Sequence, residues 1–301
     1  MRVNNYFCHS CSSVNLIQIW YHQYKRNMKQ LKLLLVLLLV SSFAYSRVQV
    51  DTISVYSQKM KKEVKSVVIL PENYSNKKHY PVVYLLHGFG DNYAKWVKTV
   101  PAIKSLSTEH QMILVCPDGG YNSWYFDSPI DSTCQYETFI TRDLLPFIDT
   151  HYSTVPNRTA RAITGLSMGG HGALYLAIRN PTLFGSAGSM SGGVDLRSST
   201  KLFDIAKRIG NIESHHNEWD NRSVINMVNE LKNKELNLII DCGVSDFFYQ
   251  INAGLHRRLM SLHIDHDYIE RPGEHNWQYW DNSIRYQFLY FDRCFDKTKK
   301  Q

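Results

Sequence analysis

Short apolar runs alternate with longer amphipathic stretches along most of this chain, and this alternation constrains the fold more than any other feature. Strand-length runs separated by helical stretches are typical of a mostly parallel sheet with helices on both faces. We therefore expect an α/β fold with an eight-stranded sheet. The first two strands lack an intervening helix, so we expect an antiparallel edge. The expected strands are 50–56, 63–70, 82–86, 112–116, 161–165, 185–190, 236–241 and 267–270.

The helical stretches lie between and after these strands. Asn180-Pro181 ends one of them, because proline disfavours helical backbone in the residue before it. Between Gly192 and Leu236 the sequence is polar and shows no strand pattern, so we expect an insertion over the carboxyl edge of the sheet, where a lid would lie. The absence of repeats or linkers predicts a single domain over residues 47–301. The expected helices are 135–151, 167–180, 247–262 and 277–291.

Residues 28–46 have the pattern of an export signal. Lys29 and Lys32 precede the apolar run 33–40, and a segment of mostly small residues ends at Ser46. We expect cleavage after Ser46 and Met28 as the true start, so that residues 1–46 are an upstream segment and a cleaved signal peptide. The run is shorter than the roughly 20 residues that a membrane span needs. We expect a secreted or periplasmic protein without stable membrane insertion after cleavage.

The net charge of +7 raises the question of a nucleic-acid partner. Residues 1–46 contain five Lys or Arg and no Asp or Glu, so only +2 remains on the rest of the chain. That charge supplies little of the counterion release that drives nucleic-acid binding, and we exclude this class. Apolar residues make up 44% of the chain and charged residues 20%, which also excludes disordered and multi-span membrane proteins.

The cysteines leave their pairing open. Cys8 and Cys11 lie in the upstream segment, and a lone C-x-x-C there is weak evidence for metal or redox chemistry. The other four permit one or two disulfides in an exported protein. Two of these four end apolar strands, where a buried thiol is an equally good interpretation. The four are Cys116, Cys134, Cys242 and Cys294.

The most specific motif is Gly165-Leu166-Ser167-Met168-Gly169, between an expected strand and an expected helix. In this context G-x-S-x-G marks a strained turn that exposes the serine hydroxyl, with glycines where side chains would not fit. The N-terminus of the following helix favours developing negative charge. We interpret Ser167 as a nucleophile.

A serine nucleophile needs a base, and the base needs an orienting acid. In this fold both follow the serine, each in a loop after a late strand. Asp246 follows strand 236–241 and His275 follows strand 267–270, each through a glycine-containing loop. We assign Ser167, Asp246 and His275 as the catalytic residues.

Three alternatives to these residues are weaker. Asp241 is a rival acid, but it lies inside a strand. His263 and His266 are rival bases, but they lie at a helix end beside Asp265 and Asp267, where a solvated polar surface explains them.

Acyl transfer also needs donors for the oxyanion, and backbone N–H groups are the usual ones. We expect the N–H of Met168, directly after the nucleophile, and that of Phe89, in the glycine-rich loop 87–92. Trp124 follows a strand at the same sheet edge and is a candidate for substrate binding, although core packing explains it equally well. The adjacent His215 and His216 face different ways, so we expect no metal site there. We also expect no cofactor.

Five segments resemble one known family of α/β-hydrolases, that of the putative esterases. These segments span nearly all of 47–301, whereas 192–234 matches no motif of the family. Members include feruloyl and acetyl-xylan esterases, tributyrin esterases, S-formylglutathione hydrolase and mycolyltransferases. Many members carry Glu where this chain has Ser245. The segments are Leu85-Leu86-His87-Gly88-Phe89-Gly90, Pro117-Asp118-Gly119-Gly120, Ser123-Trp124-Tyr125, 165–172 and Gly273-Glu274-His275-Asn276-Trp277.

The resemblance implies a serine esterase with Ser167, Asp246 and His275 as triad and the N–H groups of Phe89 and Met168 as oxyanion hole. We expect an exported carboxylic ester hydrolase that works through an acyl-enzyme, with feruloyl or acetyl esters of plant polysaccharide as substrates by analogy. The alternatives are an acyltransferase to a sugar acceptor and a non-catalytic carbohydrate-binding module. The sequence does not indicate the oligomeric state.

Overall fold

The computed structural model describes residues 18–32 and 48–299. The chain divides into two units, residues 1–46 and 47–301, and each is described by itself. In the first unit, residues 18–32 form a helix with exposed side chains. The expected apolar run 33–40 and the cleavage site at Ser46 lie outside the described residues, so the signal peptide stays a prediction. Within the described residues, no helix is long and apolar enough to cross a membrane.

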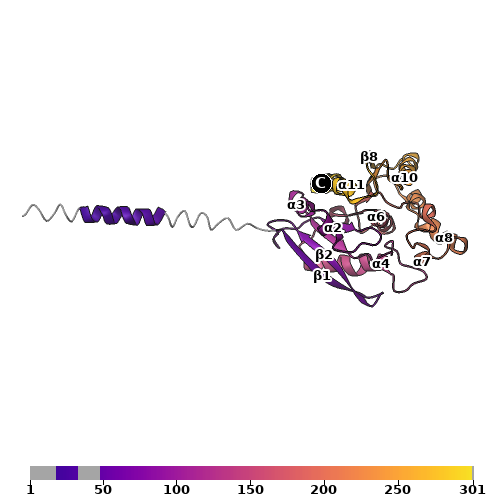
Figure 1. Cartoon of the computed structure of the whole chain (residues 1–301), viewed down its shortest axis with the longest axis horizontal. Coiled ribbons are helices and arrows are strands. Elements are labelled where there is room, and N and C mark those ends of the chain that lie inside the picture. The colour runs from indigo at the N-terminus through magenta and orange to yellow at the C-terminus, as the bar shows by residue number, and fades with distance from the viewer. Residues whose placement is uncertain (1–17, 33–47, 300–301) are drawn as a thin grey trace, which may run out of the picture. The chain divides into compact units, whose positions relative to one another are not determined.

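In its described part, the second unit is built around one sheet of eight strands (Figure 1). The strand order is β1-β2-β4-β3-β5-β6-β7-β8, with β1–β2 and β2–β4 antiparallel and the other pairs parallel. The α/β fold and the antiparallel edge are confirmed, and each expected strand end agrees within two residues. The strands are β1 (Gln49–Ser57), β2 (Lys62–Leu70), β3 (Val82–Leu86), β4 (Ile113–Pro117), β5 (Arg161–Gly165), β6 (Ser186–Met190), β7 (Asn237–Gly243) and β8 (Asp267–Arg271).

Two of the four expected helices agree closely with the structure, and two differ. The segment 135–151 is divided by a π-helix, in which the Thr141 hydroxyl donates to the Glu137 carbonyl (2.7 Å) and so enters the backbone ladder. The last helix continues past 291 because Phe295 extends its buried face. The helices are α2 (Lys95–Thr99), α3 (Ile103–Glu109), α4 (Tyr136–Thr138), the π-helix η1 (Phe139–Leu144), α5 (Leu145–His151), η2 (Arg158–Ala160), α6 (Met168–Arg179), α10 (Tyr249–Ser261) and α11 (Trp277–Lys299).

Alternate side chains of the central strand β3 enter two hydrophobic cores, one on each face of the sheet. Val82, Tyr84 and Leu86 pack in the core that includes buried residues of α5, α6 and α10. Val83 and Leu85 pack in the core that includes residues of α2, α3 and α11. A strand covered on both faces is fully apolar, which is why β3 shows no polar alternation.

The expected insertion between Gly192 and Leu236 contains no strand, and much of it is helical. Figure 1 shows α7 and α8 on the side of the body away from β1. Its elements are η3 (Leu196–Ser199), α7 (Ala206–Ile209), α8 (Ile212–Arg222), α9 (Val224–Met227) and η4 (Val228–Glu230).

Within the described residues, Cys116, Cys134, Cys242 and Cys294 form no disulfide with one another. The disulfides that the sequence permits are therefore not formed in this structure. Cys116, Cys134 and Cys242 are buried, so the interpretation of Cys116 and Cys242 as buried thiols agrees with the structure.

Candidate active site

Ser167 lies in the turn between β5 and α6, with a φ of +53°. Non-glycine residues rarely adopt this left-handed region, so the backbone at this turn is strained. A Cβ at Gly165 would lie 2.6 Å from the carbonyl oxygen of Leu86, and one at Gly169 would lie 2.5 Å from the same atom. The turn therefore needs both glycines of the motif.

The His275 side chain connects the Ser167 hydroxyl to the Asp246 carboxylate. Its Nε2 lies 2.9 Å from Oγ of Ser167, and its Nδ1 lies 2.9 and 3.0 Å from the two oxygens of Asp246. The structure thus brings together the three residues that the sequence selected. With a proton on Nδ1 donated to the carboxylate, Nε2 is free to accept the serine proton.

Backbone hydrogen bonds join the two loops that carry the acid and the base. The Val244 N–H donates to the Arg271 carbonyl and the Ser245 N–H donates to the Gly273 carbonyl, both at 2.9 Å. The Asp246 carboxylate also accepts the Phe248 N–H at 2.7 Å. These contacts hold the acid and the base in place before a ligand binds.

The rival acid, Asp241, has a different environment. It lies in β7 with an exposure of 0%. Burial raises the pKa of Asp241, and hydrogen bonds and a positive charge from its neighbours oppose that rise. These neighbours are Arg271, Tyr279 and Ser283.

The other histidines that the sequence singled out have other contacts. His266 lies 2.8 Å from His256 of α10, and His263 is exposed. His215 lies 2.8 Å from the Ser214 hydroxyl. Among residues 18–32 and 48–299, no three His, Cys, Asp or Glu side chains gather in a way that could hold a metal ion.

Both expected oxyanion donors lie next to Ser167 in the chain or in space. Met168 begins α6, and the loop of Phe89 approaches the serine so closely that a Cβ on Gly88 would lie 3.6 Å from the Ser167 Cβ. Among the backbone hydrogen bonds of the described loops, turns and helix caps, none has the Met168 N–H or the Phe89 N–H as its donor. Their role as oxyanion donors stays a prediction.

His87 is a positioning residue for this loop that the sequence analysis did not single out. Its Nε2 accepts the Gly119 N–H and its Nδ1 bonds to the Gly88 carbonyl, both at 2.8 Å. These partners require the proton on Nδ1. The imidazole therefore ties the loop of Phe89 to the loop that follows β4. Its position directly after a strand and before a glycine was the only sequence indication.

Aromatic rings surround the His275 imidazole. Phe247 lies 4.1 Å from the His275 ring between centroids, and Trp280 lies 4.9 Å from it. Trp124 is only 1% exposed, and its Nε1–H donates to the Phe203 carbonyl (3.0 Å). Trp124 is thus a buried residue that holds the insertion 192–236 through Phe203. A direct contact of Trp124 with substrate stays a prediction.

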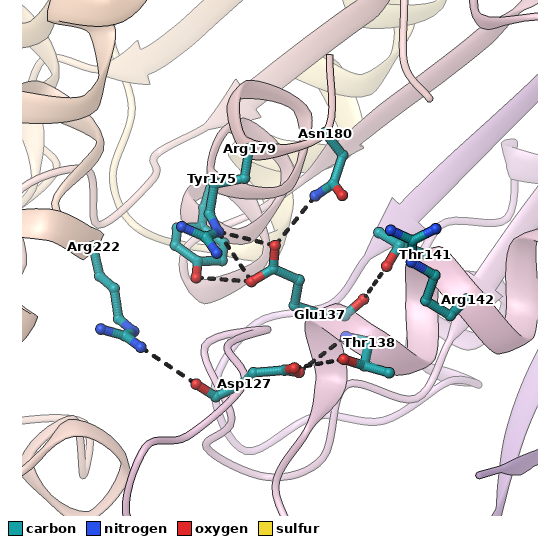
Figure 2. Close-up of a pocket in the computed structure, with 9 residues that line it drawn as sticks. All are labelled: Asp127, Glu137, Thr138, Thr141, Arg142, Tyr175, Arg179, Asn180 and Arg222. Carbon is teal, nitrogen blue, oxygen red and sulfur yellow. Dashed lines mark hydrogen bonds and ion pairs between the residues drawn. The ribbon is translucent and has the colours of Figure 1, made fainter. Parts of the chain in front are cut away.

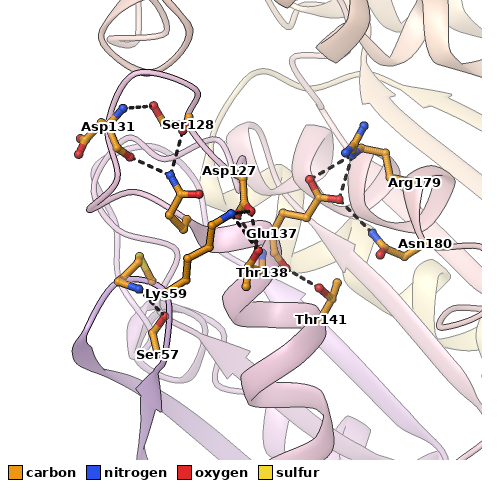
Figure 3. A network of polar contacts seen from close by, with 12 residues as sticks. Ser57, Lys59, Asp127, Ser128, Asp131, Glu137, Thr138, Thr141, Arg179 and Asn180 are labelled. Carbon is orange, nitrogen blue, oxygen red and sulfur yellow. Dashed lines mark hydrogen bonds and ion pairs between the residues drawn. The ribbon is translucent and has the colours of Figure 1, made fainter.

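A polar cavity of about 260 Å³ lies apart from Ser167, Asp246 and His275, none of which lines it (Figure 2). Its two carboxylates, Asp127 and Glu137, are already engaged by neighbouring donors. The network joins the loop of Asp127 to α4 and α6, and it explains the polar residues there without a ligand (Figure 3). Glu137 accepts from Tyr175, Arg179 and Asn180, and Asp127 accepts from Lys59 and Thr138.

Comparison with known proteins identifies a family. The sequence profile of the family described as "Putative esterase" matches residues 57–291. An esterase of Mycobacterium tuberculosis is 30% identical over 238 residues, which cover 69% of this chain and 51% of that protein. The chain thus spans about half the length of that relative. An acetyl esterase of Caldicellulosiruptor saccharolyticus is 26% identical over 269 residues, which cover 81% of this chain and 98% of the relative.

Solved structures agree with the fold. A ferulic acid esterase superposes with a TM-score of 0.72 at 26% identity, covering 82% of this chain and 99% of the other. The S-formylglutathione hydrolase of Staphylococcus aureus superposes with a TM-score of 0.72 at 23% identity, covering 82% and 100%, and it supports the fold alone. With a family profile that matches most of the described second unit, this chain belongs to the "Putative esterase" family and has an α/β-hydrolase fold.

Proposed function

We propose that this chain is a carboxylic ester hydrolase that works through an acyl-enzyme formed on Ser167. His275 Nε2 takes the hydroxyl proton while Oγ attacks the ester carbonyl carbon, and the N–H groups of Phe89 and Met168 bind the resulting oxyanion. The C–O bond to the alcohol then breaks, and the alcohol leaves with the proton from His275. Water repeats the sequence on the acyl-enzyme and releases the carboxylic acid. Asp246 keeps the imidazole in the required tautomer throughout.

One observation carries this proposal. His275 lies within hydrogen-bond distance of both Ser167 and Asp246, at 2.9 Å on each side. A general base must reach the proton that it removes, so this geometry matters more than the order of the residues along the chain. The strained turn at Ser167 supports the same role.

For the substrate, we propose acetyl or feruloyl esters of plant polysaccharide. Two similar proteins support this choice, because one is named an acetyl esterase and the other a ferulic acid esterase. We also propose that the protein is exported, because residues 28–46 have the pattern of a signal peptide. N-terminal sequencing of the secreted protein tests the export and the cut after Ser46.

Transfer of the acyl group to a sugar is a second candidate. A diacylglycerol acyltransferase/mycolyltransferase of Mycobacterium bovis is 35% identical over 124 residues, which cover 38% of this chain. The acyl-enzyme would be the same, and only the acceptor would differ. Product analysis with and without an added sugar tests this: hydrolysis releases the free carboxylic acid, whereas transfer forms an acylated sugar.

The decisive experiment is hydrolysis of p-nitrophenyl acetate by the full chain and its variants. Ser167→Ala and His275→Ala should lower kcat by about 10³-fold or more, because either loss removes the nucleophilic pathway. His263→Ala is the matched control, since it removes an exposed imidazole. Activity of His275→Ala close to that of the wild type would end the assignment. No turnover by the wild type would favour a binding module.

A further inference from the structure

A continuous row of aromatic rings runs beside Ser167. Its centroids are separated by 5.0 Å from Tyr121 to Phe89, 5.7 Å from Phe89 to Phe203 and 6.1 Å from Phe203 to Phe247. Phe247 in turn lies 4.1 Å from His275. The row therefore begins at the loop of the proposed oxyanion hole and ends on the base that transfers the proton.

The row is open to solvent at both ends. Tyr121 is 62% exposed and Phe247 is 61% exposed, while Phe203 between them is half-buried. Large apolar side chains with this exposure beside a reactive serine are unusual unless a ligand covers them. Aromatic faces prefer flat apolar groups, which they contact in stacked or edge-to-face arrangements.

Phe203 is the central ring of the row, and its backbone is strained. Phe203 and Asp204 have φ values of +56° and +54°, two consecutive non-glycine residues in the left-handed region. Such a conformation is energetically unfavourable for a residue with a side chain, so the surrounding structure must hold it. Residues of this kind cluster at active sites and ligand-binding loops.

The contacts that hold this turn come from the loop after β4. Trp124 donates to the carbonyl of Phe203 (3.0 Å), and Asn122 donates to the carboxylate of Asp204 (3.0 Å). Arg208 in turn donates to the Asn122 side-chain oxygen. The fold thus fixes a ring of the insertion against both loops that carry the proposed catalytic groups.

We propose that Phe203 determines the specificity of this site and selects esters whose acyl group is a flat, conjugated aromatic ring. This inference rests on the proposed function of Ser167. The tetrahedral carbon carries the oxyanion, the alcohol oxygen that accepts the His275 proton, and the acyl group. The Phe203 ring packs on Phe89 of the oxyanion loop, whereas Phe247 packs on His275. We therefore place the alcohol toward His275 and the acyl group against Phe203, where the ring row supplies the apolar surface that it covers.

The test compares methyl ferulate with methyl butyrate, which share an alcohol and differ in the acyl group. In Phe203→Leu, kcat/KM for methyl ferulate should fall by about tenfold, because an aromatic contact is lost while apolar volume is kept. For methyl butyrate the change should stay within about twofold. Phe203→Tyr keeps the ring and should retain the wild-type preference for methyl ferulate.

Leu202→Ala is the matched control, because Leu202 is an exposed apolar neighbour without a ring. It should change both esters by the same factor. An equal change in kcat/KM for both esters in Phe203→Leu would overturn the inference. A second pair, phenyl acetate and methyl acetate, shares the acyl group and differs in the alcohol. If Phe203→Leu lowered kcat/KM only for phenyl acetate, the ring would contact the alcohol, and the inference would also be overturned. If the wild type hydrolysed methyl butyrate but not methyl ferulate, only this inference would be overturned. If the wild type hydrolysed neither ester, the proposed function would be overturned.

Discussion

At the scale of single residues, two aspartates at the end of β7 illustrate how environment assigns a role. Asp241 and Asp246 are five positions apart, and both are buried. Asp241 faces Arg271 of β8 in an ion pair, whereas Asp246 faces an imidazole that also contacts the serine. The first arrangement stabilises the fold, and the second orients a base.

Asp246→Asn should therefore lower kcat by about 10⁴-fold with little change in the unfolding temperature. An amide presents an N–H donor to Nδ1 of His275 and favours the tautomer whose proton lies on Nε2, which then no longer accepts the serine proton. Steady-state hydrolysis of p-nitrophenyl acetate and thermal unfolding of the same preparation measure the two effects.

Asp241→Asn is the contrasting variant. It leaves the Arg271 guanidinium without its buried partner and should lower the free energy of unfolding by about 3 kcal/mol or more. The folded fraction should keep its kcat. If Asp241→Asn lost activity while remaining folded, and Asp246→Asn did not, the two roles would have to be exchanged.

At the scale of elements, α6 carries both the nucleophile turn and a buried histidine. His171 is fully buried among the rings of Trp124, Phe126 and Tyr175, and its Nε2 lies 2.8 Å from the Arg222 carbonyl. Burial lowers the pKa of His171 to about 4, and the hydrogen bond to the carbonyl opposes this shift. The helix that presents Ser167 therefore contains a group that resists protonation.

This environment predicts an acid-sensitive fold. In the unfolded chain a histidine binds a proton below about pH 6.5, but folded His171 stays neutral down to about pH 4. Between these values the unfolded state holds more protons, so acidification lowers the free energy of unfolding by up to about 1.4 kcal/mol per pH unit. The full contribution is present above pH 6.5 and is lost as the pH falls toward 4.

Urea unfolding of the wild type and of His171→Gln at pH 7, 5.5 and 4.5 measures this contribution. Glutamine keeps a donor for the Arg222 carbonyl but does not titrate, so its free energy of unfolding should fall less steeply with acid. Other groups titrate equally in both proteins, and the difference between them isolates His171. Parallel pH dependences would contradict the prediction.

At the scale of the whole molecule, the positions of the strands along the chain and the convergence of Ser167, Asp246 and His275 were predictable from sequence. Each expected catalytic residue follows a strand through a short loop, and the carboxyl ends of parallel strands meet at one edge of a sheet. The π-helix that interrupts 135–151 contains a hydrogen bond from the Thr141 hydroxyl to the Glu137 carbonyl, and periodicity reveals neither feature. The position of Phe203 depends on a strained turn held by residues far along the chain, and no local pattern indicates it.

The cysteines lead to the last prediction, which concerns the stability of the whole molecule. A native disulfide typically contributes about 2–5 kcal/mol, so its reduction lowers the unfolding temperature by several degrees. None of the four cysteines of the described region forms a disulfide, and three of them are buried. The fold should therefore depend on its two hydrophobic cores, and dithiothreitol should change the unfolding temperature by less than about 1 °C.

The same thiols should react slowly with a disulfide reagent until the protein unfolds. Burial raises the pKa of the Cys134 thiol to about 11, so little reactive thiolate exists at neutral pH, and the buried Cys116 and Cys242 are shifted in the same direction. Thiol titration in the native and denatured states, with peptide mapping under non-reducing conditions, measures this directly. A bridged peptide pair, together with a fall in unfolding temperature on reduction, would contradict the prediction and show that a disulfide constrains the fold described for residues 48–299.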